Sequence, residues 1–167
     1  MEIYMRYIVA MILALLMIGC SSSKEEQNVE AKLVVGKSLA DLKIADQQER
    51  MQTLQEDTKI VFFSFSKKVG HICNTFLEAN SVDFLAKHNT VYVADVSPAP
   101  SIIKNMFILP DLKKLEFPIL LINDDKLSAE YSKGMSKEEI VVVYLKNKTI
   151  TKIVNLKTKE ELKALFQ

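Results

Sequence analysis

The chain has 167 residues, of which 49% are hydrophobic, and this composition suits one folded domain and excludes a disordered chain. Its 22 lysines and arginines nearly balance its 21 aspartates and glutamates, so the formal net charge is +1. No basic stripe is visible, which argues against a nucleic-acid partner.

The first twenty residues combine a positive charge, an apolar run and a cysteine. An uncharged apolar run covers residues 7–18 and follows Arg6. This run is too short to cross about 30 Å of hydrocarbon as a stable helix, but it fits the apolar part of a signal peptide. It ends at Gly19 and Cys20, and three serines follow. This ending resembles the lipobox of bacterial lipoproteins, although Met17 stands where leucine is usual.

The resemblance implies that residues 1–19 are a signal peptide and that Cys20 receives the lipid. Two or three acyl chains anchor a protein stably, since each buried methylene contributes roughly 0.8 kcal/mol. Residues 20–31 then form the lipidated cysteine and a flexible polar tether, and residues 32–167 form the domain. We therefore expect a lipid-anchored protein of the cell envelope that faces the periplasm, in either the inner or the outer membrane. The alternative is an ordinary secretion signal with a coincidental cysteine.

Short strands are predicted at the start of the domain, over residues 32–35 and 41–46. Residues 59–66 are rich in phenylalanine and β-branched side chains, which predicts a core strand. A helix is expected over residues 74–87, and a further strand over residues 90–96.

The second half of the domain continues this alternation. After a proline-rich break, Ser101 is expected to cap a helix over residues 102–109. The later expected elements are a short helix over 110–115, a strand over 117–122, a short helix over 127–132, a hairpin of strands 140–145 and 149–156, and a helix over 158–166 capped by Thr158. Strands that alternate with helices predict an α/β fold with helices on the faces of the sheet.

This order of elements resembles the thioredoxin-like superfamily over residues 36–166. Residues 60–73 resemble its first core strand and active-site turn, and residues 141–166 resemble its closing hairpin and helix. Residues 36–47 and 117–131 resemble the redoxin branch, on the peroxiredoxin-like side of the superfamily. The resemblance implies a central mixed sheet with helices on both faces.

Cysteine chemistry is the activity that this resemblance brings into question. A dithiol oxidoreductase needs C-x-x-C at the start of the helix that follows the first core strand. The matching residues here are Gly70, His71, Ile72 and Cys73, so only the second thiol position is filled. Because the lipid takes Cys20, one free cysteine remains, and thioredoxin-type dithiol exchange is excluded by count.

Three interpretations of Cys73 stay open: a small buried hydrophobic residue, the thiol of a one-cysteine peroxidase, or a thiol redox partner. In a peroxiredoxin register Cys73 takes the peroxide-reacting position, but Ser66 and Gly70 replace the proline and threonine of that family's pocket. Lys67, Lys68 and the helix N-terminus could still favour the thiolate. The first interpretation is preferred.

No metal or other cofactor is expected. Metal sites normally need three or four ligands, and His88 is the only histidine besides His71, which is interpreted as a loop residue. The apolar run of residues 106–109 either packs on the core or forms a partner surface, and the core-facing helix is preferred.

The sequence thus predicts a membrane-anchored thioredoxin-like protein without the C-x-x-C dithiol. A non-catalytic binding or structural role is preferred, with an envelope protein as the expected partner besides the membrane. The alternative is an enzyme, a one-cysteine thiol peroxidase or redox partner acting through Cys73.

Overall fold

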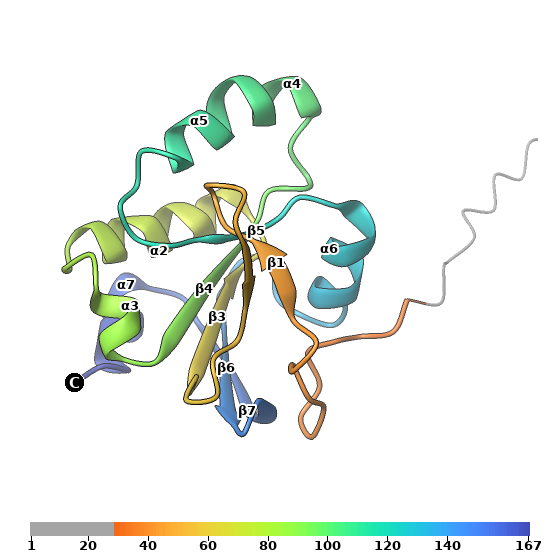
Figure 1. Cartoon of the computed structure of the whole chain (residues 1–167), viewed down its shortest axis with the longest axis vertical. Helices are drawn as coiled ribbons and strands as arrows, with labels where there is room; N and C mark the ends of the chain where they lie inside the picture. The colour runs from red at the N-terminus through yellow and green to blue at the C-terminus, as the bar shows by residue number, and fades with distance from the viewer. Residues whose placement is uncertain (1–28) are drawn as a thin grey trace, which may run out of the picture.

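The computed structural model describes residues 29–167. The predicted signal peptide, the lipid site at Cys20 and most of the predicted tether lie outside the described residues. Figure 1 shows a central sheet with a small hairpin in front of it and helices around it. Among residues 29–167, no helix is both long and apolar enough to cross a bilayer.

A five-stranded sheet has the strand order β5-β4-β3-β6-β7, and β1 and β2 form a separate two-stranded sheet. The strands are β1 (Lys43–Ala45), β2 (Met51–Thr53), β3 (Ile60–Ser64), β4 (Thr90–Asp95), β5 (Leu120–Ile122), β6 (Ile140–Lys146) and β7 (Thr149–Leu156). The helical elements are α2 (Lys67–Glu78), α3 (Phe84–Lys87), α4 (Ser101–Ile103), the π-helical η1 (Lys104–Ile108), α5 (Leu109–Leu112), α6 (Asp125–Ser132) and α7 (Lys159–Ala164).

The sheet is mixed, as the sequence predicts. Strand β3 lies at its centre, parallel to β4 and antiparallel to β6. The edges are β5, parallel to β4, and β7, antiparallel to β6. Because side chains alternate along a strand, Val61 and Phe63 face one core while Phe62 and Ser64 face the other.

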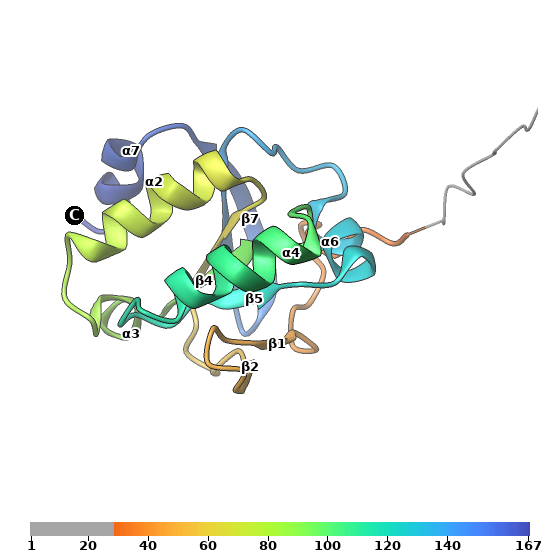
Figure 2. The same ribbon diagram turned by 90° about the horizontal axis from the view of Figure 1, so that it is seen from above.

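Each face of the sheet is covered by different elements. The N-terminal segment, the β1–β2 hairpin and α6 cover one face, where Phe63 stacks on Tyr131 of α6 with ring centroids 5.7 Å apart. Helices α2, α3 and α7 cover the other face, where Phe76 and Leu162 are buried. Figure 2 shows α2 and α7 on the side of the sheet opposite β1 and β2. The predicted α/β fold with helices on both faces is confirmed.

The predicted helix over residues 74–87 is wrong in its bounds. Helix α2 begins seven residues earlier, at Lys67, because the Ser66 side chain accepts the Val69 N–H at 3.4 Å and caps the helix. The predicted active-site turn is therefore helical, and Gly70 is an interior helix residue.

The same predicted helix also ends too late. Asn80 closes α2 by donating its side-chain N–H to the Phe76 carbonyl at 2.7 Å, and α3 begins only at Phe84. Phe76 and Phe84 therefore do not share one helix, yet their rings meet edge-on at 5.3 Å. The apolar spacing that predicts one helix face instead reflects two helices that pack on one core.

Three other expectations differ from the structure. Residues 32–35 form no strand, because the segment turns at Gly36, which donates its N–H to the Ile150 carbonyl. Strand β2 is not predicted by the sequence pattern. The two helices expected over 102–109 and 110–115 form one run from α4 through η1 to α5, which begins at Ser101 after Pro100.

The C-terminal unit is confirmed. Asn147 and Lys148 form the turn between β6 and β7 with φ of 50° and 59°, as expected for a tight hairpin turn. Thr158 caps α7 by accepting the Glu161 N–H at 3.1 Å. The Glu161 carboxylate in turn accepts the Lys157 N–H at 2.6 Å.

Replacing Gly70 by alanine tests the position of α2. A Cβ there would lie 3.5 Å from Ser64 Oγ and 3.8 Å from the Tyr92 hydroxyl, which is ordinary contact. Because alanine favours a helix interior, Gly70→Ala is expected to raise the free energy of unfolding by about 0.5–1 kcal/mol in urea titrations.

The matched control is Gly134→Ala, since Gly134 has a φ of +76° that alanine resists. It should lower the free energy of unfolding. Loss of stability in Gly70→Ala would contradict a helix that runs through residue 70.

Candidate functional site

The first candidate site is the start of α2, which follows the central strand β3 directly. Ser66 uses its hydroxyl to cap the helix, and Lys67 and Lys68 are exposed in the first turn. Lys68 faces Glu138 at 3.7 Å, and both side chains are about three-quarters exposed. Such a pair contributes little to stability. The helix start therefore carries one hydroxyl and two ammonium groups, and no thiol.

Cys73 lies in the second turn of α2 and faces the sheet. It is the one free cysteine among the residues that the structure describes, and it is fully buried. Val69, Phe76 and Leu77 lie three or four residues away on the same helix face and are also buried. The spacing of these residues places the thiol on the apolar face of the helix.

Burial raises the pKa of the Cys73 thiol to about 12, although a hydrogen bond with Tyr92 offsets part of the effect. The pKa of Tyr92 is itself raised well above 10, mainly because that side chain is buried. The Tyr92 hydroxyl also lies 2.9 Å from Ser64 Oγ. Because the thiolate is the nucleophilic form, this arrangement disfavours reaction of Cys73 at neutral pH.

Reasoning from the sequence did not single out Ser64 and Tyr92, which join Cys73 where α2 packs on the sheet. The signal was strand alternation, because Ser64 shares its parity with Phe62, and Phe62 stacks on Tyr92 at 4.8 Å. These polar groups satisfy one another inside a core that is otherwise apolar.

Neither histidine belongs to a ligand cluster. His71 is exposed on α2, rather than in the predicted loop. The Nδ1 atom of His88 lies 2.8 Å from the Phe84 carbonyl, and its ring packs against Phe166. Within residues 29–167, no three side chains of the types that bind metals gather in one place.

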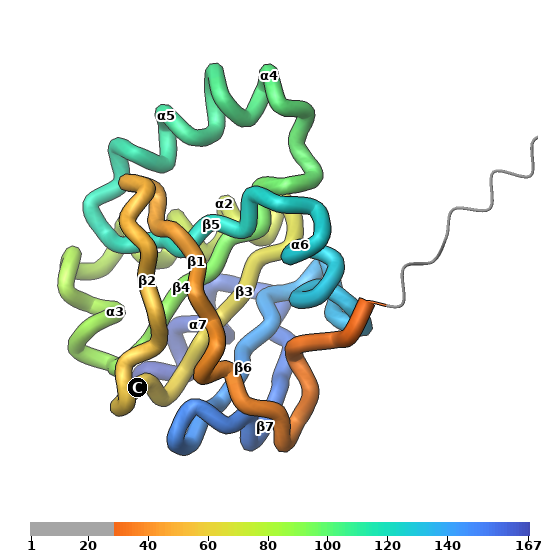
Figure 3. The backbone as a smooth tube through the Cα atoms, turned by 45° about the vertical axis from the view of Figure 1, so that its right-hand side comes forward, coloured from red at the N-terminus to blue at the C-terminus, as the bar shows by residue number. Residues whose placement is uncertain are grey.

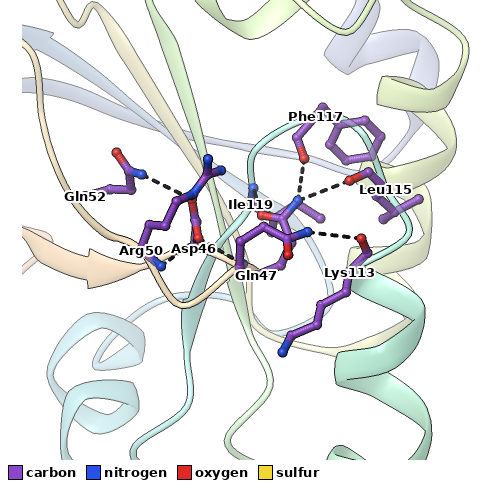
Figure 4. Close-up of polar contacts among 9 residues, drawn as sticks. Asp46, Gln47, Arg50, Gln52, Lys113, Leu115, Phe117 and Ile119 are labelled. Carbon is purple, nitrogen blue, oxygen red and sulfur yellow. Dashed lines mark hydrogen bonds and ion pairs between the residues drawn. The ribbon is translucent and has the colours of Figure 1, made fainter.

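The second candidate site is the polar cluster after β1, within the segment that resembles the redoxin opening. Figure 4 shows Gln47 reaching the chain that precedes β5. Its Nε2 donates to the carbonyls of Phe117 at 2.7 Å and Leu115 at 3.3 Å, and its Oε1 accepts the Ile119 N–H at 2.9 Å. The buried amide thus has partners at both ends, so it clamps the hairpin to the sheet instead of awaiting a ligand.

Asp46 organises the turn of the same hairpin. Its Oδ1 accepts the backbone N–H groups of Gln48 and Arg50, both at 2.9 Å. Its Oδ2 accepts Arg50 Nε at 2.9 Å and Gln52 Nε2 at 3.1 Å. Burial alone would raise the pKa of Asp46, but these hydrogen bonds lower it below its ordinary value. The carboxylate is ionised and fully engaged, which makes it a poor general base.

A hollow of about 510 Å³ lies beside this cluster, lined by residues of the β1–β2 turn and the segment after α5. Its cationic side chains already have partners. Lys113 pairs with Glu49 and Lys114 with Asp111, both at 2.7 Å, while Arg50 pairs with the buried Asp46. The hollow therefore offers no unpaired charge to an anionic ligand.

An exposed apolar stripe is the third candidate. Ile102, Ile103, Met106 and Phe107 lie on one side of the α4–η1 helix, and Met106 and Phe107 are 64% and 56% exposed. The preferred prediction of a core-facing run over residues 106–109 is therefore wrong for its first two residues. Only Ile108 and Leu109 pack against the core.

Comparison with known proteins shows the fold of the chain. No family profile matches its sequence, and no curated protein matches it either. A solution structure described as a putative protein disulfide isomerase from Bacteroides thetaiotaomicron covers 82% of this chain and 88% of its own, with 18% identity and a TM-score of 0.50. The crystal structure of StoA from Bacillus subtilis covers 75% and 96%, with 16% identity and a TM-score of 0.50. The chain has the thioredoxin-like fold.

The raised pKa of Cys73 predicts a loss of stability at alkaline pH. The unfolded thiol loses its proton near pH 8.5, whereas the folded thiol keeps it up to about pH 12. Stability is therefore fully present below pH 8.5 and falls as the pH rises toward 12. Between pH 8 and 10, wild type should lose about 2 kcal/mol more than Cys73→Ala in urea titrations under reducing conditions. Equal losses in the two proteins would contradict a buried thiol.

Removing the Gln47 amide tests the clamp. Gln47→Leu keeps the size of the side chain but leaves two carbonyls and one N–H without their partner, so it should cost about 3 kcal/mol of unfolding free energy. The control is Gln48→Leu, which removes one exposed hydrogen bond and should cost under about 1 kcal/mol. Equal effects of the two substitutions would refute the clamp.

Proposed function

We propose that this chain is a lipid-anchored protein of the cell envelope whose thioredoxin-like domain has a binding or structural role rather than a catalytic one. The observation that carries the non-catalytic half is the burial of Cys73, which is fully covered beneath α2 and has its pKa raised to about 12. The anchored half rests on the resemblance of Gly19 and Cys20 to a lipobox after a short apolar run.

The first described residues indicate where a tether from Cys20 would join the domain. The Val29 carbonyl accepts a hydrogen bond from Lys133 Nζ at 2.7 Å, and Glu30 pairs with Lys37. Val29 and Glu30, near the end of the predicted tether, are thus attached to the domain directly. A tether from Cys20 would connect to this point beside α6 (Figure 3).

We infer that the domain belongs to the redoxin branch of the fold, and two units outside the five-stranded sheet support this inference. The β1–β2 hairpin covers one face and is joined to β5 through the Gln47 clamp. Between β5 and β6, the chain inserts α6, whose first turn is capped by Asp124 accepting the Leu127 N–H at 2.9 Å. Both units follow the order in which the redoxin resemblance expects them.

An enzyme acting through Cys73 is the alternative, and the geometry weighs against it. Reaction with a peroxide needs a thiolate that the peroxide can reach. Here the thiol faces Tyr92 and the apolar side chains of the sheet, with Val69 and Phe76 on either side. Reaction would require α2 to leave the sheet.

Substitution of the proposed lipid site tests the anchor. Cys20→Ser should abolish the incorporation of labelled palmitate and cleavage between Gly19 and residue 20, because serine lacks the thiol that receives the diacylglyceryl group. Mass spectrometry of the N-terminal fragment checks both. The matched control is Ser21→Ala, which should be lipidated and cleaved in the same way as the wild-type protein. A wild-type chain without lipid would contradict the proposal that Cys20 is lipidated.

A peroxide assay tests the non-catalytic role. With a thiol reductant present, the wild-type protein should consume hydrogen peroxide no faster than Cys73→Ala, since the buried thiol stays protonated. Consumption that depends on Cys73, together with sulfenic acid at that residue, would establish the enzyme instead.

A further inference from the structure

The apolar stripe of Ile102, Ile103, Met106 and Phe107 holds four of the eight large hydrophobic side chains that are exposed among residues 29–167. Because they stand at positions i, i+1, i+4 and i+5 of one helical run, they form a single ridge. We propose that this stripe inserts into the interfacial layer of the membrane to which Cys20 anchors the chain. This inference rests on the proposed lipid anchor.

The charge of the helix fits a lipid surface. The run from α4 to α5 and the two residues after it carry three lysines. Lys113 and Lys114 pair with Glu49 and Asp111, whereas Lys104, between Ile103 and Met106, contacts only the Asn123 carbonyl. An apolar ridge with a lysine beside it is typical of helices that lie in the interface of anionic bilayers. The helix stands above the sheet in Figure 1, at the periphery of the molecule.

Helix α6 lies between the stripe and the point where the predicted tether joins the domain. At one end, Lys104 Nζ lies 3.4 Å from the Asn123 carbonyl, just before α6. At the other end, Lys133 Nζ donates to the Val29 carbonyl at 2.7 Å, just after α6. Helix α6 has eight residues and is thus about 12 Å long. The chain therefore enters the domain at one end of α6, and the helix that carries the stripe contacts the other end.

The proposed tether holds the domain close to the bilayer. Nine residue steps separate Cys20 from Val29, which span at most about 30 Å. A domain held that close meets the membrane at an effective concentration in the millimolar range for short flexible linkers. Even shallow insertion of two isoleucines, a methionine and a phenylalanine then suffices to orient the domain.

Insertion would fix which part of the domain faces away from the membrane. In Figure 1, α3 and the C-terminus lie at the lower left of the molecule and α4 at its upper right. They would point away from the bilayer, where an envelope partner can approach them. The stripe would be the contact with lipid, and not the contact with that partner.

Single-tryptophan fluorescence tests the inference, because the chain has no tryptophan of its own. Phe107→Trp places the probe on the stripe. Val82→Trp is the matched control, since Val82 is 54% exposed against 56% for Phe107 but lies between α2 and α3. Each mature, lipidated variant is reconstituted into vesicles of phosphatidylethanolamine and phosphatidylglycerol, with or without brominated acyl chains.

The expected result is that Phe107→Trp emits at a shorter wavelength in vesicles than in detergent-free buffer and loses most of its fluorescence to brominated lipid. Val82→Trp should do neither. A shift to shorter wavelength without quenching by brominated lipid would mean that a second copy or another protein covers the stripe, and would overturn the inference. Vesicle-bound protein with an unshifted, unquenched Phe107→Trp would overturn it as well.

Flotation of the vesicles separates failure of the anchor from failure of the stripe. Protein that does not float with the vesicles lacks the anchor. The same variants, starting at Ser21 and held through an N-terminal hexahistidine tag on chelating lipid, then report on the stripe alone. Quenching of Phe107→Trp in that arrangement supports insertion, and its absence refutes it.

Discussion

The packing of α2 onto the central strands is the interaction on which the site depends. Phe62 and Tyr92 stack at 4.8 Å on the sheet, while Val69, Cys73 and Phe76 cover them from the helix. This seam joins the helix to β3 and β4 and buries the thiol completely. The contacts that stabilise the fold are therefore the ones that keep Cys73 from solvent. A thiol that is part of the core cannot react without local unfolding of the helix that covers it.

The sequence predicted the sheet well because its strands carry strong local signals. The aromatic run that forms β3 and the apolar run that forms β6 are buried on both faces, and the turn at Asn147 and Lys148 joins β6 to β7. The start of α2 was harder to predict, because Gly70 looks like a turn residue while Ser66, the actual cap, lies four residues before it. The start of the helix depends on whether the serine cap or the low helix propensity of glycine has the larger effect, and residue spacing alone does not show which one does.

The candidate sites were less predictable because their contacts are distant in sequence. Gln47 hydrogen-bonds to Phe117, 70 residues away, so no local pattern shows that its amide is used as a clamp. The exposure of Met106 and Phe107 was missed for a related reason. Periodicity identifies one face of a helix, but it does not say whether another element covers that face. The proposed anchor and the proposed insertion of the stripe would together place the domain on a membrane with its thiol enclosed.

The rate at which maleimide labels Cys73 tests the central claim, that the one thiol of the described domain is a core residue and not a reactive site. Labelling is compared in native protein and in protein unfolded by urea at the same pH. We expect the labelling rate of the native thiol to be the rate in the unfolded chain multiplied by the small fraction of molecules in which Cys73 is transiently exposed. This fraction, and with it the native labelling rate, should rise as urea is added. Native labelling as fast as that of the unfolded chain would contradict the account, because it would require an exposed thiol in the folded domain.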